Sequence, residues 1–223
     1  MTYQIVKSSR LPRLKSAADT SHFRYSLLIL LLLLTGKVTS QTFDAGLTGG
    51  IVGSQISGDN LGGFNKAGFQ AGAFSGFKLS EKIGVRFEMY YIQKGSRKNY
   101  NPEEPQFPFY LLRLHYVEVP ILLRYHHKRF VFEGGLSYGT LFKSLEEDVS
   151  GVLPSTIPFK RSEIAGQVGI GTNITDNLAM VWRYSNSLLP VRGHSGGASY
   201  YFNMGQYNSV IEFLLQYTLK NRD

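Results

Sequence analysis

The chain has 223 residues, a length that suits a single domain, and it contains no cysteine, which excludes a disulfide framework and a thiolate metal site. It carries 24 lysine and arginine residues against 16 aspartate and glutamate residues. Residues 1–40 hold six of the basic residues and one of the acidic ones, so the rest of the chain has a net charge of only +3. No basic stripe is left that would indicate binding to nucleic acid.

Residues 1–40 have the composition of a secretory signal peptide. Five basic side chains come first: Lys7, Arg10, Arg13, Lys15 and Arg24. An apolar run then spans residues 27–34, and the modest side chains of Val38, Thr39 and Ser40 suit a signal peptidase, so we expect cleavage before Gln41. The alternative is an uncleaved membrane anchor, but a spanning helix needs ~20 apolar residues and this run is much shorter.

The rest of the chain, residues 41–223, predicts eight β-strands and no helix. The expected strands are residues 43–54, 67–79, 83–94, 114–126, 130–142, 162–174, 178–187 and 208–219. Short connections (80–82, 127–129 and 175–177) alternate with long ones (55–66, 95–113, 143–161 and 188–207). This alternation is typical of outer-membrane barrels, whose tight turns face the periplasm and whose long loops face outward.

Each predicted strand has one face without charge. In the third strand, Val85, Phe87 and Met89 alternate with Arg86 and Glu88, and a period of two places successive side chains on opposite faces. A soluble lipocalin-like barrel would put the apolar face inside, around a ligand. The unbroken apolar face and the alternating loop lengths favour the other arrangement, an eight-stranded antiparallel up-and-down transmembrane β-barrel with the apolar face toward lipid.

The opposite face carries the charges, which we therefore expect inside the barrel. This set is Lys78, Arg86, Glu88, Glu118, Arg124, Glu133, Glu163, Arg183 and Glu212, accompanied by Gln70, Gln167 and Gln216. Eight strands leave an interior barely wide enough for side chains, and buried charges must pair. We therefore predict structural ion pairs that plug the lumen, rather than an open pore.

Four segments resemble the PorT-like outer-membrane β-barrel proteins of Bacteroidetes. They read SQISGD (residues 54–59), QKGS (93–96), YVEVPILLRY (116–125) and RYS (183–185). The resemblance extends over essentially all of residues 41–223, and the segment with proline after Val-Glu-Val is its most specific part. It implies an eight-stranded outer-membrane barrel and a link to a machine that secretes proteins across the outer membrane. It implies no catalytic residues.

Two further motifs have alternative interpretations. The sequence GHSGG at residues 193–197 matches the G-x-S-x-G pattern of a hydrolase, with Ser195 beside His194 and an acid from the run 146–148, but that pattern works on a strand-to-helix turn and here lies in a long loop. The same acidic run could bind a divalent cation at lipid phosphates, although a solvated charge cluster is commoner. His126 and His127 lack a third metal ligand nearby in the sequence.

These observations predict a non-enzymatic outer-membrane barrel that acts as an accessory or structural part of the envelope, with a possible link to protein secretion. We expect no cofactor and no metal. The expected partners are outer-membrane lipid, the barrel-assembly machinery and protein components of an envelope or secretion complex. The alternatives are a loop-borne binding or adhesion module, a soluble lipocalin-like barrel and, less favoured, a lipid hydrolase that uses Ser195.

Overall fold

A computed structural model describes residues 43–59, 61–99, 102, 109–153, 157–193 and 205–219. By its internal contacts the chain divides into the units Met1–Ser40 and Gln41–Asp223, and all of the described residues belong to the second unit. The predicted signal segment, residues 1–40, lies outside the described residues.

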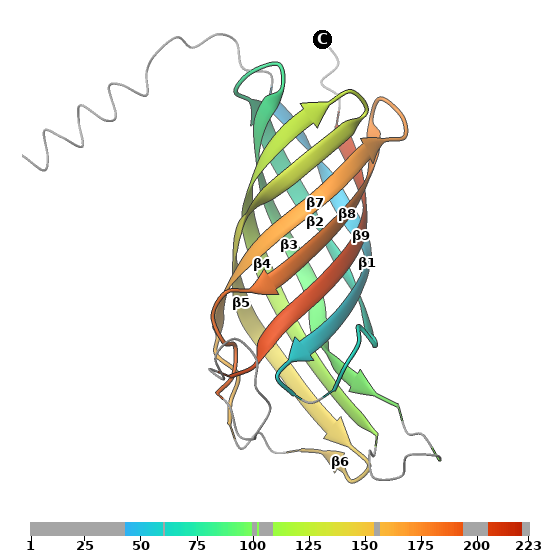
Figure 1. Cartoon of the computed structure of the whole chain (residues 1–223), viewed down its shortest axis with the longest axis vertical. Coiled ribbons are helices and arrows are strands. Elements are labelled where there is room, and N and C mark those ends of the chain that lie inside the picture. Colours follow the sequence, from blue (N-terminus) through green and yellow to red (C-terminus); the bar gives the residue numbers. More distant parts are fainter. Residues whose placement is uncertain are drawn as a thin grey trace, which may run out of the picture. The chain divides into compact units, whose positions relative to one another are not determined.

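Strands make up nearly all of the described chain (Figure 1). They are β1 (Phe43–Ser57), β2 (Lys66–Lys78), β3 (Ile83–Lys98), β4 (Tyr110–His127), β5 (Phe130–Asp148), β6 (Gly151–Val152), β7 (Ser162–Asn173), β8 (Leu178–Ser187) and β9 (Tyr207–Leu219). Among the described residues, no helix is long and apolar enough to cross a membrane.

Eight of these strands close into a ring. Each strand pairs antiparallel with its neighbours in the order β4-β3-β2-β1-β9-β8-β7-β5, and β4 pairs with β5 to close it. Neighbours in the ring follow one another in sequence, apart from the short β6 and the closing pair of β1 with β9. The predicted fold is therefore confirmed: an all-β, antiparallel up-and-down barrel whose backbone groups pair within the ring.

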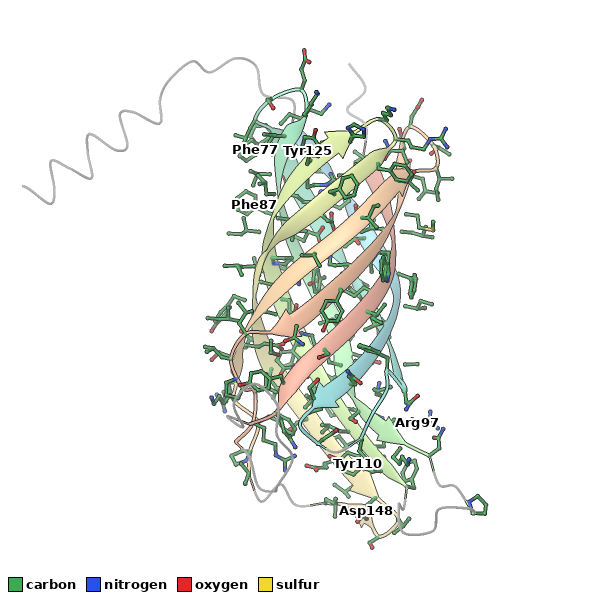
Figure 2. All side chains as sticks on the ribbon, viewed as in Figure 1. Phe77, Phe87, Arg97, Tyr110, Tyr125 and Asp148 are labelled. Atoms are coloured by element: carbon green, nitrogen blue, oxygen red, sulfur yellow. The ribbon has the colours of Figure 1, made fainter. Side chains whose placement is uncertain are left out.

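The ring has two different ends. The short connections, which span residues 79–82, 128–129 and 174–177, lie at one end, which we call the short-turn end. The four long connections lie at the other, which we call the long-loop end. In Figure 2 the labelled residues Phe77 and Tyr125 mark the short-turn end, and Arg97, Tyr110 and Asp148 mark the long-loop end.

The exterior is apolar and the interior is charged. Phe87, Met89, Ile121, Leu136 and Phe213 are exposed, and the other apolar side chains on outward positions of the strands are exposed or, like Val85, half-buried. The alternating residues on these strands are buried, including Arg86 and Glu88. This arrangement is the reverse of a lipocalin, so the lipocalin-like alternative is wrong.

Two details of the strand prediction are also wrong. Strands β3, β4 and β5 extend into segments that were expected to be long loops, and β6 is an additional strand that pairs only with Glu147 and Asp148 of β5. Alternation does continue through Leu111–Leu114 in β4, with Leu112 and Leu114 buried. In β5 a register shift at Phe142 interrupts the alternation and conceals the outer half of the strand from a search for period two.

Candidate functional site

The charged residues predicted for the interior all lie on inward positions of the strands. Eight of these nine residues are buried, at 8% exposure or less: Arg86, Glu88, Glu118, Arg124, Glu133, Glu163, Arg183 and Glu212. Lys78, the ninth charge expected inside, ends β2 at the short-turn end, where its side chain is exposed. The candidate site is therefore the lumen itself.

Arg183 on β8 is the centre of the middle lumen. It is fully buried, and its guanidinium contacts Glu88 of β3 at 2.9 Å and Glu133 of β5 at 2.7 Å. A third carboxylate, Glu212 of β9, lies 3.7 Å from it. In the ring order β8 lies opposite β3, so the contact between Arg183 and Glu88 spans the lumen. One forked cation thereby joins four strands through charge-assisted hydrogen bonds.

A second cation, Lys94 on β3, lies nearer the long-loop end. Its ammonium group pairs with Glu118 of β4 and lies 3.1 Å from Glu163 of β7. Lys94 was not among the interior charges predicted from the sequence, although it is the last residue of the strand predicted for residues 83–94. Lys94 lies four residues after Tyr90 and six after Glu88, so alternation along the predicted strand would have placed its side chain inside with theirs.

Neutral side chains complete the pairing of these carboxylates. Ser187 donates to Glu163 at 2.6 Å and Asn208 donates to the other Glu163 oxygen at 2.9 Å. The hydroxyl of Tyr90 donates to Glu118 at 3.1 Å. Buried carboxylates need such additional donors, because an ion pair alone does not repay the cost of removing two charges from water.

Two arginines lie toward the short-turn end. Arg86 donates to Gln216 and lies 3.4 Å from Asp44, and its guanidinium stacks on the ring of Phe74 at 3.8 Å. Arg124 lies 3.7 Å from Glu133. A cavity of about 450 Å³ opens beside these two arginines and is also lined by Lys78, His126 and Asp176. The cavity lies at one mouth of the barrel, and the ion pairs of the middle lumen lie beyond it.

The long-loop end of the lumen is filled by apolar side chains. The cluster consists of Val52, Ile56, Tyr90, Ile92, Leu112, Leu114, Tyr116, Leu141, Phe159, Val191 and Val210. Phe159 and Val191 come from the connections on either side of β7 and β8, and the backbone N–H of Lys160 donates to the carbonyl of Val191 at 2.7 Å. This apolar layer differs from the prediction, which was of structural ion pairs alone.

The other predicted motifs give no catalytic arrangement in the described residues. His194, Ser195 and the following glycines lie outside those residues. Glu146 accepts from Tyr110 at 2.6 Å and pairs with Arg192 at 3.2 Å, and burial together with this hydrogen bond raises the pKa of Tyr110. Within the described residues no group of three or more His, Cys, Asp or Glu side chains could hold a metal ion.

A closed antiparallel ring with an apolar exterior and a charged interior defines a transmembrane β-barrel protein. The chain belongs to the family described as outer membrane protein beta-barrel domain, whose model matches residues 39–192. It is therefore an outer-membrane protein that contacts outer-membrane lipid, as predicted.

Comparisons with individual proteins give less detail. No curated protein matches the chain. Among solved structures, Ail, the attachment invasion locus protein of Yersinia pestis, is 13% identical over 79% of this chain and 98% of its own, with a TM-score of 0.46. Neisserial surface protein A is 11% identical over 81% of this chain and 100% of its own, with a TM-score of 0.48. Outer membrane protein AlkL is 14% identical over 84% of this chain and 96% of its own, with a TM-score of 0.38.

Proposed function

We propose that this protein is a non-enzymatic outer-membrane barrel with a closed lumen, an accessory or structural component of the envelope. The observation that supports this proposal is the contact of Arg183 with Glu88 on the opposite strand, which crosses the middle of the lumen. The eight lumen charges then have a structural role, because they hold the strands together rather than act on a substrate.

Two successive layers support a closed lumen. The ion pairs of Arg183 and Lys94 fill the middle, and the apolar cluster around Leu112 and Leu114 fills the long-loop end. An ion that entered from the short-turn end would have to separate buried pairs, which costs about 3–5 kcal/mol for each pair that loses a partner. It would then have to cross a layer of apolar side chains.

Within the envelope, the role that we propose is in protein secretion, as part of a PorT-like group of Bacteroidetes proteins. The resemblance in residues 116–125 supports this assignment. In the structure this segment forms the membrane-crossing part of β4, with Val117, Ile121 and Leu123 outward and Glu118 and Arg124 inward. Export by a signal peptide in residues 1–40 and insertion by the barrel-assembly machinery belong to the same proposal.

Conductance in a planar lipid bilayer tests the closed lumen. The purified full-length protein should give no steady, porin-like current at moderate voltage. The double variant Leu112→Ala/Leu114→Ala, which thins only the apolar layer, should also remain closed because the ionic layer is intact. A large, stable current from the unmodified protein would overturn the proposal and favour transport.

A second candidate function is a binding module at the long-loop end. The specific observation is that β3, β4 and β5 continue past the ring as a three-stranded sheet, where Leu111 pairs with both Arg97 and Glu147 and β6 borders β5. A photo-crosslinking residue placed at Leu111 should capture a protein in the native membrane if this function is correct. The same residue placed at Lys128, in a short turn, is the matched control.

A further inference from the structure

A β-bulge in β5 places an aromatic and a basic side chain next to each other on the barrel exterior. Lys143 pairs with His115 of β4 and Leu141 pairs with Tyr116, so Phe142 is an extra residue with no partner in β4. Both Phe142 and Lys143 are exposed. Strict alternation would turn Lys143 inward, and the bulge turns it outward instead.

The bulge completes an aromatic surface on the outside of β2 to β5. The ring of Phe142 lies 5.9 Å from the rings of both Tyr91 and His115, and the ring of Tyr91 lies 5.2 Å from that of Phe69. A hydrogen bond of 2.7 Å joins the Tyr91 hydroxyl to Nδ1 of His115. Aromatic rings with polar tips are typical of the boundary between lipid tails and water.

Strand geometry places this surface at the edge of the lipid. A tilted strand rises ~2.5 Å per residue along the membrane normal, given ~3.3 Å along the strand and a tilt of ~40°. Ten residues of β4 separate Tyr125 at the short-turn end from His115, which corresponds to ~25 Å. This distance equals the height of the apolar band of an outer-membrane barrel, ~25 Å. Side chains beyond His115 therefore lie at the level of lipid headgroups.

Basic residues gather at that level. Arg113 lies on β4 two positions beyond His115. Lys66 lies within electrostatic range of Arg113 and Arg97, and His115 lies within electrostatic range of Lys143, Lys66 and Arg113. Arg113 pairs with Glu147 at 3.4 Å. Neither Arg97 nor Lys143 has an ion pair with any residue that the structure describes, and both are exposed. Three exposed or half-buried cations, Arg97, Arg113 and Lys143, therefore lie with one carboxylate, Glu147, next to the aromatic surface, while Lys66 is buried on an inward position of β2.

We propose that Arg97, Arg113 and Lys143, with the charge of Lys66 behind them, bind the phosphate of a lipid headgroup in the outer leaflet. The acyl chains of this lipid would lie along Phe69, Tyr91 and Phe142. Two observations support this proposal: the cations complement a phosphate in charge, and they lie just above the apolar band. The proposal takes the long-loop end to be on the outer side of the membrane, as in other outer-membrane barrels. A phosphate at this position would be attracted by several cations at once and would exchange hydrogen bonds to water for charge-assisted hydrogen bonds to these side chains.

Native mass spectrometry of the purified full-length barrel tests the proposal. The two probes are bisphosphorylated lipid A and the same lipid after removal of its phosphates, each added to detergent-solubilised protein. The unmodified protein should retain the phosphorylated lipid in preference to the dephosphorylated one. Each cation near a headgroup contributes about fivefold, so Arg113→Gln/Lys143→Gln should reduce the preference by roughly 25-fold.

Matched variants separate a specific site from general attraction. Arg113→Lys/Lys143→Arg keeps the charges and should keep most of the preference. Lys128→Gln/Arg129→Gln removes two cations at the short-turn end and should change nothing. If Arg113→Gln/Lys143→Gln does not fold, the single variant Lys143→Gln tests the proposal instead, because this exposed side chain can change without a cost to folding. Its preference for the phosphorylated lipid should fall about fivefold. Equal retention of both lipids by the unmodified protein, or an equal loss in the short-turn control, would overturn the proposal.

Discussion

The middle of the lumen and its long-loop end are lined by the inward faces of the same strands, yet they are filled by opposite chemistries. In the middle, Arg183 and its three carboxylates are fully buried. At the long-loop end, Leu112, Leu114 and their neighbours form an apolar cluster. Both regions are buried, one filled largely by ion pairs and the other by apolar side chains.

The difference follows from what can reach each region. The middle is enclosed by strands on all sides, so only side chains from the strands can fill it, and arginine and glutamate are long enough to meet there from opposite strands. The long-loop end also receives Phe159 and Val191 from its connections, and these cover the strands as the second layer of a small globular core would. The two fillings should respond differently to mutation, because a stranded charge costs more than a cavity that can relax.

The largest effect should come from Arg183→Ala. This change leaves Glu88, Glu133 and Glu212 without their shared cation and should lower the free energy of unfolding by about 3–5 kcal/mol. Urea unfolding in detergent micelles, followed by the fluorescence of Trp182, the one tryptophan of the chain, measures this loss. Arg183→Lys keeps the positive charge without the forked geometry, so it should retain only part of the stability that Arg183→Ala loses. Unchanged stability of the alanine variant would show that the middle is hydrated.

Substitutions in the apolar layer should lower the free energy of unfolding somewhat less. Leu114→Ala removes a fully buried side chain and should cost about 2–4 kcal/mol, a loss that includes the cavity left behind. The same urea titration measures it, and Leu114→Met is the control that keeps the volume. A loss larger than that of Arg183→Ala would reverse the proposed order of the two regions.

A smaller effect is expected where an ion pair has a spare partner. Glu118→Gln removes one of the two carboxylates that contact Lys94, but Glu163 remains at 3.1 Å. The expected loss is about 1–2 kcal/mol, because the cation stays paired. Bilayer recordings on the same variant should show no channel. A loss as large as that of Arg183→Ala would mean that Glu163 cannot hold Lys94 alone.

The smallest effect concerns a single loop carboxyl outside the membrane-crossing strands. Burial raises the pKa of Asp59 above its usual value. Between the unfolded and the folded pKa the folded state holds more protons, so stability should increase as the pH falls through this range. Thermal unfolding of the unmodified protein and of Asp59→Asn, compared across acidic pH, should show a shallower dependence for the variant. Identical profiles would show that Asp59 titrates normally.

Much of the fold could be predicted because its main determinant is local. Alternation along a strand depends only on the residues two positions apart, so Val85, Phe87 and Met89 identify the lipid face, and Arg86 and Glu88 the lumen, without knowledge of any other strand. The turns around Lys82, Lys128 and Asp176 similarly depend on a few adjacent residues. The sequence by itself therefore determined the ring of antiparallel strands and the inward direction of its charges.

The tertiary structure alone decided which charges meet and what surrounds them. The partner of Arg183 depends on the register of every strand pair between β8 and β3, and each register shift changes which residues face one another across the lumen. The bulge at Phe142 is such a shift, and it also turns Lys143 toward lipid. The apolar layer includes Phe159 and Val191, which lie in connections and therefore have no strand alternation to reveal them. A period of two fixes the side of a residue, and only the closed ring fixes its neighbours.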